Sequence, residues 1–403
     1  MKKDFGKLAI EQAKKKKGKL EIAAKVKVEN RDDLSIAYTP GVAAVSRLLA
    51  EKPELASTYT IKSNAVAVVS DGSAVLGLGN IGPLGALPVM EGKAVLFKEF
   101  AGIDAYPIVL DTQDPDEVIK IVKNIAPGFG GINLEDIAAP NCFYVEDRLQ
   151  DIGIPVFHDD QHGTAVVVMA AVINAAKVVN KPLGKLRIVV SGAGAAGNAL
   201  THLLACRDRS GYQISKRLCV PVGDITVLDS KGAIYEGREG QGERGKGLDL
   251  YKKELARFTN KKKIAGGLKE AIQGADVFIG VSKANLLTSE MVKSMNQRPV
   301  IFAMANPVPE IDPEIAKKAG AAVVGTGRSD FPNQINNVLA FPGIFRGALD
   351  SGAKTVTTGM KLAAALALAG MVKRPTTENI LPSALDKKVA RTIAAAVEID
   401  AGG

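Results

Sequence analysis

The stretch KLRIVVSGAGAAGNAL, residues 185–200, decides the fold of the second half of the chain. It predicts a buried strand, LRIVV, followed by a glycine-rich turn and the start of a helix. Gly192, Gly194 and Gly197 have the spacing GxGxxG. In this motif the first glycine permits a tight turn, the second lets a pyrophosphate approach, and the third brings helix and strand together. We therefore expect a dinucleotide to bind at this helix N-terminus, over a loop that also contains Ala195 and Ala196.

Asp229 closes the next predicted strand, DITVLD, where a carboxylate can accept hydrogen bonds from the ribose hydroxyls of NAD. It follows Gly192 at more than the usual spacing of roughly 20 residues. We attribute the excess to a loop insertion at Arg207–Val222. Lys231 could hold the 2′-phosphate of NADP, or could be a solvated turn residue. These residues favour NAD slightly, with NADP accepted.

Short apolar runs alternate with helical patterns along the rest of the chain, which indicates an α/β fold with parallel sheets. In the second half, DVFIGVS, PVIFAMAN and AAVVGTG continue a doubly wound, Rossmann-type sheet. In the first half we predict strands at AVAVVS, AVLGLG, AVLFKEF, PIVLD, GGINLEDI and IPVFHDD. A long apolar helix, residues 162–179, should link two domains, 1–161 and 162–403. Residues 10–55 should be helical and basic around a loop at Ser35–Ala43, and Gly237–Lys263 should be an exposed excursion.

Carboxylates follow two of the predicted strands of the first domain: Glu135, Asp136, Asp159 and Asp160. Because parallel strands end at one edge of a sheet, these groups should converge there and repel one another unless a cation joins them. Oxygen ligands select a hard ion, Mg²⁺ or Mn²⁺. The alternative is that these acids cap helix N-termini. His158 and His162 flank the second pair, but a chain with three His offers little for zinc.

Charge and cysteine content bound the other possibilities. The net charge of +9 lies largely in residues 1–30, where ten Lys meet four acids and a single aromatic residue, Phe5, which is too little for base stacking. We expect a solvated helix there and no nucleic-acid partner. The three cysteines, Cys142, Cys206 and Cys219, are odd in number, so we expect no disulfide and a reducing compartment. No secretory signal and no apolar run of about 18 residues is present, which predicts a soluble, cytoplasmic protein without a membrane partner.

Four further polar residues are candidates for a site. Tyr38 lies in a loop, and Lys93 precedes a predicted strand, where apolar neighbours could draw its pKa down to about 7–8 and make it a base. Asn306 closes a strand, and Asn337 lies in DFPNQINNVLAFPG; such amides could hold a carboxylate or a nicotinamide. Taken alone, each of the four is better explained as a structural residue.

Several long motifs occur in order along residues 15–385: SIAYTPGVA, SDGSAVLGLGNIGPLGALPVMEGKAVLFKEFAGIDA, INLEDIAAPNCF, PVFHDDQHGTA, SGAGAAG, MANPVPEI and DFPNQINNVLAFPG. In this respect the chain resembles the short prokaryotic type of malic enzyme. The resemblance implies a malic-enzyme-type α/β domain before the Rossmann domain. It also implies a homodimer that converts L-malate to pyruvate and CO₂ with NAD or NADP and Mg²⁺ or Mn²⁺, and that decarboxylates oxaloacetate.

Carried over by motif, the resemblance makes Lys93 the general base and Tyr38 the general acid that protonates enolpyruvate. It makes Glu135, Asp136 and Asp160 the metal ligands, with Asp159 beside them. Asn306 and Asn337 become amides at the substrate, and Asn306 also approaches the cofactor. One departure stands out: larger members place an Arg for a malate carboxylate where this chain has Ala74.

Two other functions are compatible with parts of this pattern. A two-domain amino-acid dehydrogenase also pairs a Lys with a Rossmann domain, but it does not need the four acids. A non-catalytic nucleotide-binding protein would need the glycine loop and none of Tyr38, Lys93 or Asp160. Metal-dependent, malate-dependent reduction of the cofactor distinguishes the three.

Overall fold

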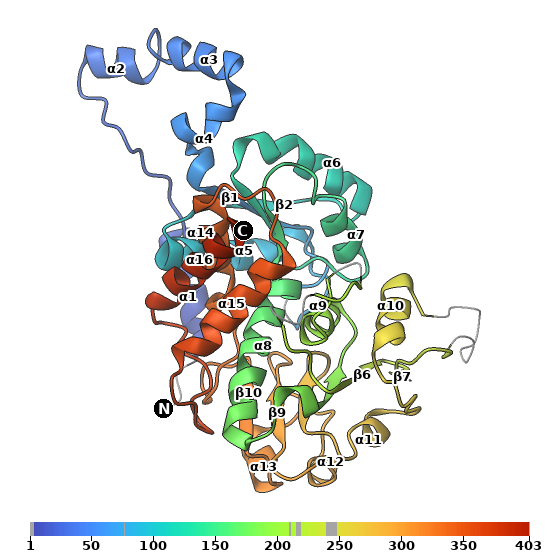
Figure 1. The fold of residues 1–403 in the computed structure, drawn as a ribbon. Helices are drawn as coiled ribbons and strands as arrows, with labels where there is room; N and C mark the ends of the chain where they lie inside the picture. The colour runs from blue at the N-terminus through green and yellow to red at the C-terminus, as the bar shows by residue number, and fades with distance from the viewer. Residues whose placement is uncertain (1–3, 76, 209–210, 215–218, 239–247, 403) are drawn as a thin grey trace.

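The computed structural model describes residues 4–402 except 76, 209–210, 215–218 and 239–247, and it contains two parallel sheets (Figure 1). The first sheet has the strand order β2-β1-β3-β4, and every pair of neighbours is parallel. Its strands are β1 (Ala65–Ser70), β2 (Asp104–Val109), β3 (Gly131–Leu134) and β4 (Val156–His158). All four overlap predicted strands, because each includes a short apolar run between turn residues.

The second sheet has the order β10-β9-β8-β5-β6-β7, with β7 antiparallel to β6 and the other pairs parallel. Its strands are β5 (Arg187–Ser191), β6 (Asp224–Asp229), β7 (Gly232–Ala233), β8 (Val277–Gly280), β9 (Val300–Ala303) and β10 (Val323–Thr326). The chain leaves β5 toward β6 on one side and later continues through β8, β9 and β10 on the other. This change of direction beside β5 is the switch point of a doubly wound sheet, so the Rossmann prediction is confirmed.

The described residues also form helices, most of which pack on or between the two sheets. They are α1 (Phe5–Lys16), α2 (Arg31–Ala37), α3 (Val42–Glu51), α4 (Ala56–Tyr59), α5 (Gly82–Ala101), α6 (Pro115–Ile125), α7 (Asn141–Asp147), α8 (Asp159–Val179), α9 (Ala195–Leu204), α10 (Leu250–Phe258), α11 (Leu268–Ala271), α12 (Ser289–Lys293), α13 (Pro313–Lys318), α14 (Phe341–Asp350), α15 (Thr358–Met371) and α16 (Lys388–Ala401). Short 3-10 turns occupy Pro53–Leu55, Ile61–Asn64, Ala126–Gly128, Leu183–Lys185 and Asn337–Leu339.

The predicted long apolar helix is α8, which packs against α9 and α15 between the two sheets. It is long and apolar enough to cross a membrane, but 78% of its most apolar window is buried inside the protein, as in the core helix of a soluble protein. One hydrophobic cluster contains Val66 of β1, Val168 of α8 and Val190 of β5. The C-terminal helices return to the first sheet, where Phe341 and Phe345 of α14 stack edge-on against Phe97 of α5. The division at residue 161 stays a prediction.

Three local predictions of the first half are wrong. AVLFKEF is the last part of α5, whose buried Phe97 lies on the face toward α14, rather than a strand. The described residues of AVLGLG form a turn closed by a bridge between Val75 and Gly79. Ser35–Ala37 belong to α2 instead of a loop. Periodicity cannot separate a short buried strand from a buried helical segment, which explains the first error.

The polar segment Gly237–Lys263 is not a simple excursion. Residues 239–247 lie outside the described part, and the following residues form α10, which buries Leu255 and Ala256. The Lys-rich N-terminus does form an exposed helix, α1, without a buried residue. Helices α2 and α3 also bury nothing, and Figure 1 shows them standing away from the sheets as an arm; we call residues 31–51 the arm.

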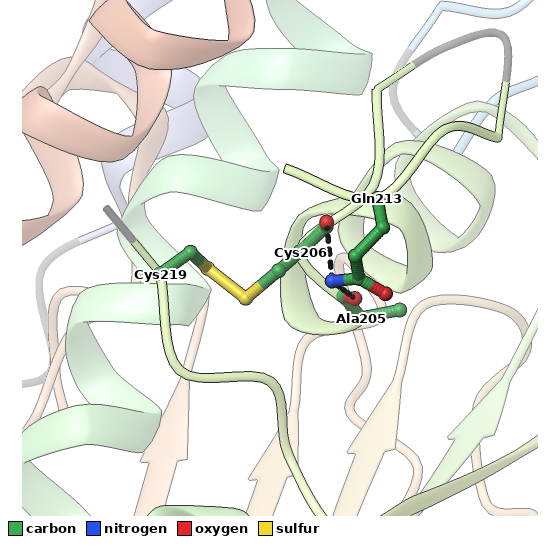
Figure 2. The surroundings of a disulfide bond; sticks show 4 residues. All are labelled: Ala205, Cys206, Gln213 and Cys219. Carbon is green, nitrogen blue, oxygen red and sulfur yellow. Dashed lines mark hydrogen bonds between the residues drawn. A yellow bond between two sulfur atoms is a disulfide. The ribbon is translucent and has the colours of Figure 1, made fainter. Parts of the chain in front are cut away.

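A disulfide joins Cys206 and Cys219, which contradicts the expectation of no disulfide (Figure 2). Both cysteines are buried, and Gln213 lies over the first of them, donating from Nε2 to the carbonyl oxygens of Ala205 and Cys206. The bond ties the predicted insertion, of which residues 209–210 and 215–218 lie outside the described part, to the end of α9. An odd cysteine count could not reveal this pair, because the count says nothing about which two cysteines the fold brings together.

Candidate active site

The four predicted carboxylates converge at the carboxyl edge of the first sheet. Glu135 and Asp136 follow β3 and are almost fully buried, whereas Asp159 and Asp160 form the first turn of α8 directly after β4. Oxygen atoms of Glu135, Asp136 and Asp160 lie within 4.8 Å of one another. The backbone N–H of Asp136 donates to Oδ2 of Asp160 at 2.8 Å. The two strand ends therefore form one cluster of acids, which we call the carboxylate cluster, with Asp159 behind it.

Lys93 reaches this cluster from the middle of α5. Its Nζ lies 2.5 Å from Oδ2 of Asp159 and 2.8 Å from Oε1 of Glu135. The ammonium group also lies 4.4 Å from the centre of the Phe341 ring, and the side chain is only 7% exposed. The lysine thus joins the carboxylates of the two strand ends.

The predicted lowering of the Lys93 pKa is wrong for this arrangement. Burial by itself lowers the pKa of Lys93, but the charges of Asp159 and Glu135 more than offset burial and hold that pKa above its ordinary value. The sequence indicated the apolar neighbours of Lys93 on α5, and the acids come from distant segments. The two buried acids therefore favour the protonated form of Lys93.

Burial has the opposite effect on the acids. It raises the pKa of Glu135, Asp159 and Asp160 above that of a carboxyl group in water. Oδ1 of Asp159, which is fully buried, has no hydrogen-bond donor among the residues that the structure describes. Crowded, desolvated carboxylates of this kind are stabilised by added positive charge, and hard oxygen ligands fit Mg²⁺ or Mn²⁺.

A cavity of about 940 Å³ extends from the carboxylate cluster to the nucleotide loop, a size typical of small-molecule sites. Its walls bring together most of the predicted site residues: Ala74, Lys93, Glu135, Asp136, Asp160, Gly194, Ala195, Ala196, Asn306 and Asn337. Asp159 lies behind this wall, in contact with Lys93. Asn336, neighbour of Asn337, also lines the cavity.

Tyr38 is the exception among the predicted residues. It follows α2 on the arm, its side chain is 68% exposed, and it is not among the described residues that line the cavity. The fold of one chain therefore brings Lys93 to the carboxylates and leaves Tyr38 outside.

The glycines of the nucleotide loop have the three roles expected from their spacing. Gly192 has φ +122°, and a Cβ atom there would meet the carbonyl oxygen of Val281 at 2.8 Å. A Cβ on Gly197 would collide with the carbonyl oxygen of Gly192, so this glycine lets α9 pack on the turn. A Cβ on Gly194 would meet nothing within 4 Å, which leaves open space where a pyrophosphate would approach.

Asp229 lies beside a second pocket, of about 590 Å³, which shares Gly194 with the larger cavity. Its Oδ1 accepts the backbone N–H of Lys231, and its Oδ2 accepts Nη2 of Arg238 at 2.7 Å. Burial raises the pKa of Asp229, but the hydrogen bond from Arg238 leads the effects that bring it below its ordinary value. Nζ of Lys252 lies 3.4 Å from the same carboxylate and lines the pocket, whereas Lys231 is not among the described lining residues.

Three basic residues at these sites escaped the sequence analysis. Arg238 and Lys252 lie within the polar segment Gly237–Lys263, which we expected to be an exposed excursion. Lys19 lines the large cavity and donates from Nζ to the carbonyl oxygen of Pro88 at 2.6 Å. It was one of ten lysines in the basic N-terminus, and no local signal distinguished it from the others.

Comparison with known proteins shows the family to which the chain is similar. Residues 17–150 match the family described as malic enzyme, N-terminal domain, and residues 161–401 match malic enzyme, NAD binding domain. The bifunctional malic/malolactic enzyme of Bacillus subtilis is 54% identical over 392 residues, 96% of this chain and 91% of that protein. The NADP-dependent malic enzyme of Escherichia coli is 47% identical over 365 residues, 90% of this chain and 46% of the longer protein.

A solved structure shares the fold over nearly the whole chain. It is the NAD-dependent malic enzyme of Thermotoga maritima, with a TM-score of 0.89 and 50% sequence identity. The alignment covers 97% of this chain and 98% of that one.

Proposed function

This chain belongs to the malic enzyme family, and we propose that its active centre is the cavity between the carboxylate cluster and the nucleotide loop. The enzyme converts L-malate to pyruvate and CO₂ and reduces NAD(P). The observation that carries the assignment of the centre is the position of Lys93, which joins Glu135 and Asp159 at a cavity that also reaches Gly194. The same centre should decarboxylate oxaloacetate.

The residues present fit both groups that the reaction requires. Glu135, Asp136 and Asp160 would hold Mg²⁺ or Mn²⁺, because their oxygens are close enough to share one ion. The loop from Gly192 to Gly197 would hold the cofactor pyrophosphate at the N-terminus of α9. When bound, the cation supplies a Lewis acid and the nicotinamide accepts a hydride.

Lys93 and Asp159 would act together on the proton of the malate hydroxyl. The neighbouring acids favour the protonated form of Lys93, so it can accept that proton only after giving one of its own to a neighbour. Oδ2 of Asp159 lies 2.5 Å from Nζ, and burial raises the pKa of this carboxyl, so it is placed to receive the proton. Asn306 and Asn337 line the same cavity and would donate their amide hydrogens to substrate oxygens.

Tyr38, the proposed acid that protonates enolpyruvate, would then have to come from a second copy of the chain. The arm that carries it buries no side chain and exposes Leu34, Ile36 and Val45. Exposed apolar residues on an extended segment favour contact with another chain. We therefore propose a homodimer in which each arm completes the cavity of its partner.

The choice of cofactor stays a proposal, since relatives named for NAD and for NADP both occur. The ionised Asp229 favours the ribose hydroxyls of NAD and repels a 2′-phosphate. Lys252 at the same pocket reduces that repulsion. We propose that NAD is preferred and NADP accepted, with Lys252 in the role that the sequence suggested for Lys231.

A cytoplasmic location and the absence of a nucleic-acid partner stay predictions. The first depended in part on the absence of a disulfide, and the bond between Cys206 and Cys219 removes that support.

The test is malate-dependent reduction of NAD with and without a chelator, followed by the absorbance of reduced nicotinamide at about 340 nm. EDTA should abolish the reaction, and excess Mg²⁺ or Mn²⁺ should restore it. Asp160→Asn should raise the metal concentration needed for half-maximal rate, because one anionic ligand is lost. Full activity in chelator would show that the carboxylate cluster holds no catalytic metal, and reduction driven by amino acids instead of malate would favour the dehydrogenase alternative.

A further inference from the structure

Malate carries two carboxylates, and the large cavity offers few positive charges to receive them. Among the described residues that line it, Lys19 and Lys93 are the two with a cationic side chain. Lys93 is already engaged by Asp159 and Glu135. Ala74, which lines the same cavity, offers a methyl group and no charge. A metal ion on the three acids would offset charge at that end of the cavity, but the malate carboxylate remote from them still needs a cation, and Lys19 is the candidate.

The backbone directs Lys19 to this place. Helix α1 ends in two residues with left-handed conformation, Lys17 with φ 56° and Gly18 with φ 108°, and these turn the chain toward α5. A Cβ atom on Gly18 would lie 3.0 Å from Oε1 of Glu91, so the glycine lets the chain pass close to α5. Nζ of Lys19 then reaches the carbonyl oxygen of Pro88.

Space for a ligand extends from Lys19 toward the catalytic lysine. Pro88 and Lys93 lie on the same helix, five residues apart, which corresponds to about 7.5 Å along the helix axis. Gly92, one turn beyond Pro88, lines the cavity, and a Cβ atom there would meet nothing within 4 Å. A glycine inside a helix is unfavourable, and here its missing side chain leaves the wall open between the two lysines.

We infer that Lys19 is a substrate-binding residue that holds the malate carboxylate remote from the carboxylate cluster. This assignment rests on the proposed function. When malate binds, the ammonium group of Lys19 leaves the neutral carbonyl of Pro88 and pairs with a malate carboxylate, which is the stronger hydrogen-bond partner for a cation. Lys19 thereby makes the site selective for dicarboxylates over 2-hydroxy acids with a single carboxylate.

Three variants test the assignment: Lys19→Met, which keeps a long apolar side chain without charge, Lys19→Arg, and the control Lys15→Met on exposed α1. Lys19→Met should raise the KM for malate about 10- to 100-fold, the effect of losing one charge-assisted hydrogen bond, and leave kcat and the KM for NAD near wild type. Lys19→Arg should recover most of the affinity. The inhibition constant of succinate should rise in parallel with the KM for malate, and that of butyrate should not change.

The outcomes separate this inference from the proposed function. A wild-type protein without malate oxidation overturns both. An active wild type, with a KM in Lys19→Met equal to that in Lys15→Met, overturns the Lys19 assignment alone. A loss of kcat at unchanged KM also overturns it, because that result assigns Lys19 to the support of α5.

Discussion

The two parallel sheets place polar groups at their carboxyl edges in different ways. At the first sheet, the buried ammonium group of Lys93 lies between the buried carboxylates of Glu135 and Asp159 and offsets part of their charge. At the second sheet the equivalent position is a turn of small residues, Gly192 to Gly197, and the nearby Asp229 is paired with the partly exposed Arg238 and Lys252. One edge depends on buried charge and the other on backbone shape.

This difference predicts two kinds of mutational effect. A buried ion pair that loses one partner leaves an uncompensated charge, so changes at the first edge should be severe. Lys252 at the second edge is 27% exposed and partly screened by water, so its removal should have a graded effect and should alter selectivity. Four experiments test these expectations and related ones, in decreasing order of effect.

Lys93→Ala should reduce malate oxidation about 10²- to 10⁴-fold, the usual contribution of a positioned acid–base group. The matched control is Lys98→Ala on the same helix, because Lys98 pairs with Asp104 at the surface at 2.7 Å. The control should keep its activity and lose less than about 1 kcal/mol of unfolding free energy. Steady-state rates and urea unfolding measure both. Equal activity of the two variants would contradict the special role of the buried edge.

Tyr38→Phe should lose about 10²-fold or more in overall turnover, with the exposed Tyr59→Phe as its control. Tyr38→Phe and Lys93→Ala chains with different affinity tags are co-expressed, and purification on both tags in turn isolates the heterodimer. If each arm serves the partner's cavity, one site in the heterodimer keeps both residues, and about half of the wild-type activity should return. If Tyr38 serves its own chain, both sites stay defective and no activity returns.

The disulfide gives the third effect, on stability. Cys206 and Cys219 are separated by 13 residues, and closing a loop of that length stabilises the fold by about 3 kcal/mol in the chain-entropy model. Cys206→Ser, or dithiothreitol added to the wild type, should lower the urea midpoint accordingly. Cys142→Ala is the control for loss of a cysteine outside the bond, and its urea midpoint should still fall on addition of dithiothreitol as that of the wild type does. An unchanged midpoint in reductant would show that the bond contributes nothing to stability.

The smallest effect concerns the cofactor. Lys252→Ala should lower kcat/KM for NADP by a factor that corresponds to about 1.5–3 kcal/mol of lost binding free energy. The kcat/KM for NAD should stay nearly unchanged, since NAD lacks the 2′-phosphate. Lys231→Ala is the matched control, because Lys231 is not among the described residues of the pocket. A selective loss in Lys231→Ala instead would restore the original prediction, and a wild type that strongly prefers NADP would show that the charge of Asp229 carries less weight than we assign it.

Sequence reasoning predicted the local parts of the site well. The carboxylates followed from their place after two apolar runs, and the cavity contains Asn306 and Asn337 as the motifs implied. It failed where a residue's partners come from elsewhere in the chain. The pKa of Lys93 is raised and not lowered, because Asp159 and Glu135 approach it from other segments. Tyr38 matched its motif equally well, yet the fold of one chain keeps it outside the cavity.

Local sequence is sufficient to predict the strands β1, β3, β4 and β5, the glycine turn after β5, and the acids that follow β3 and β4, because each depends on neighbours a few residues away. Tertiary structure alone decided that AVLFKEF is helical, that Cys206 pairs with Cys219, and that Lys19 meets α5. These outcomes depend on contacts between distant segments. A short apolar run, an odd cysteine or one lysine among ten is compatible with several environments until the fold selects one.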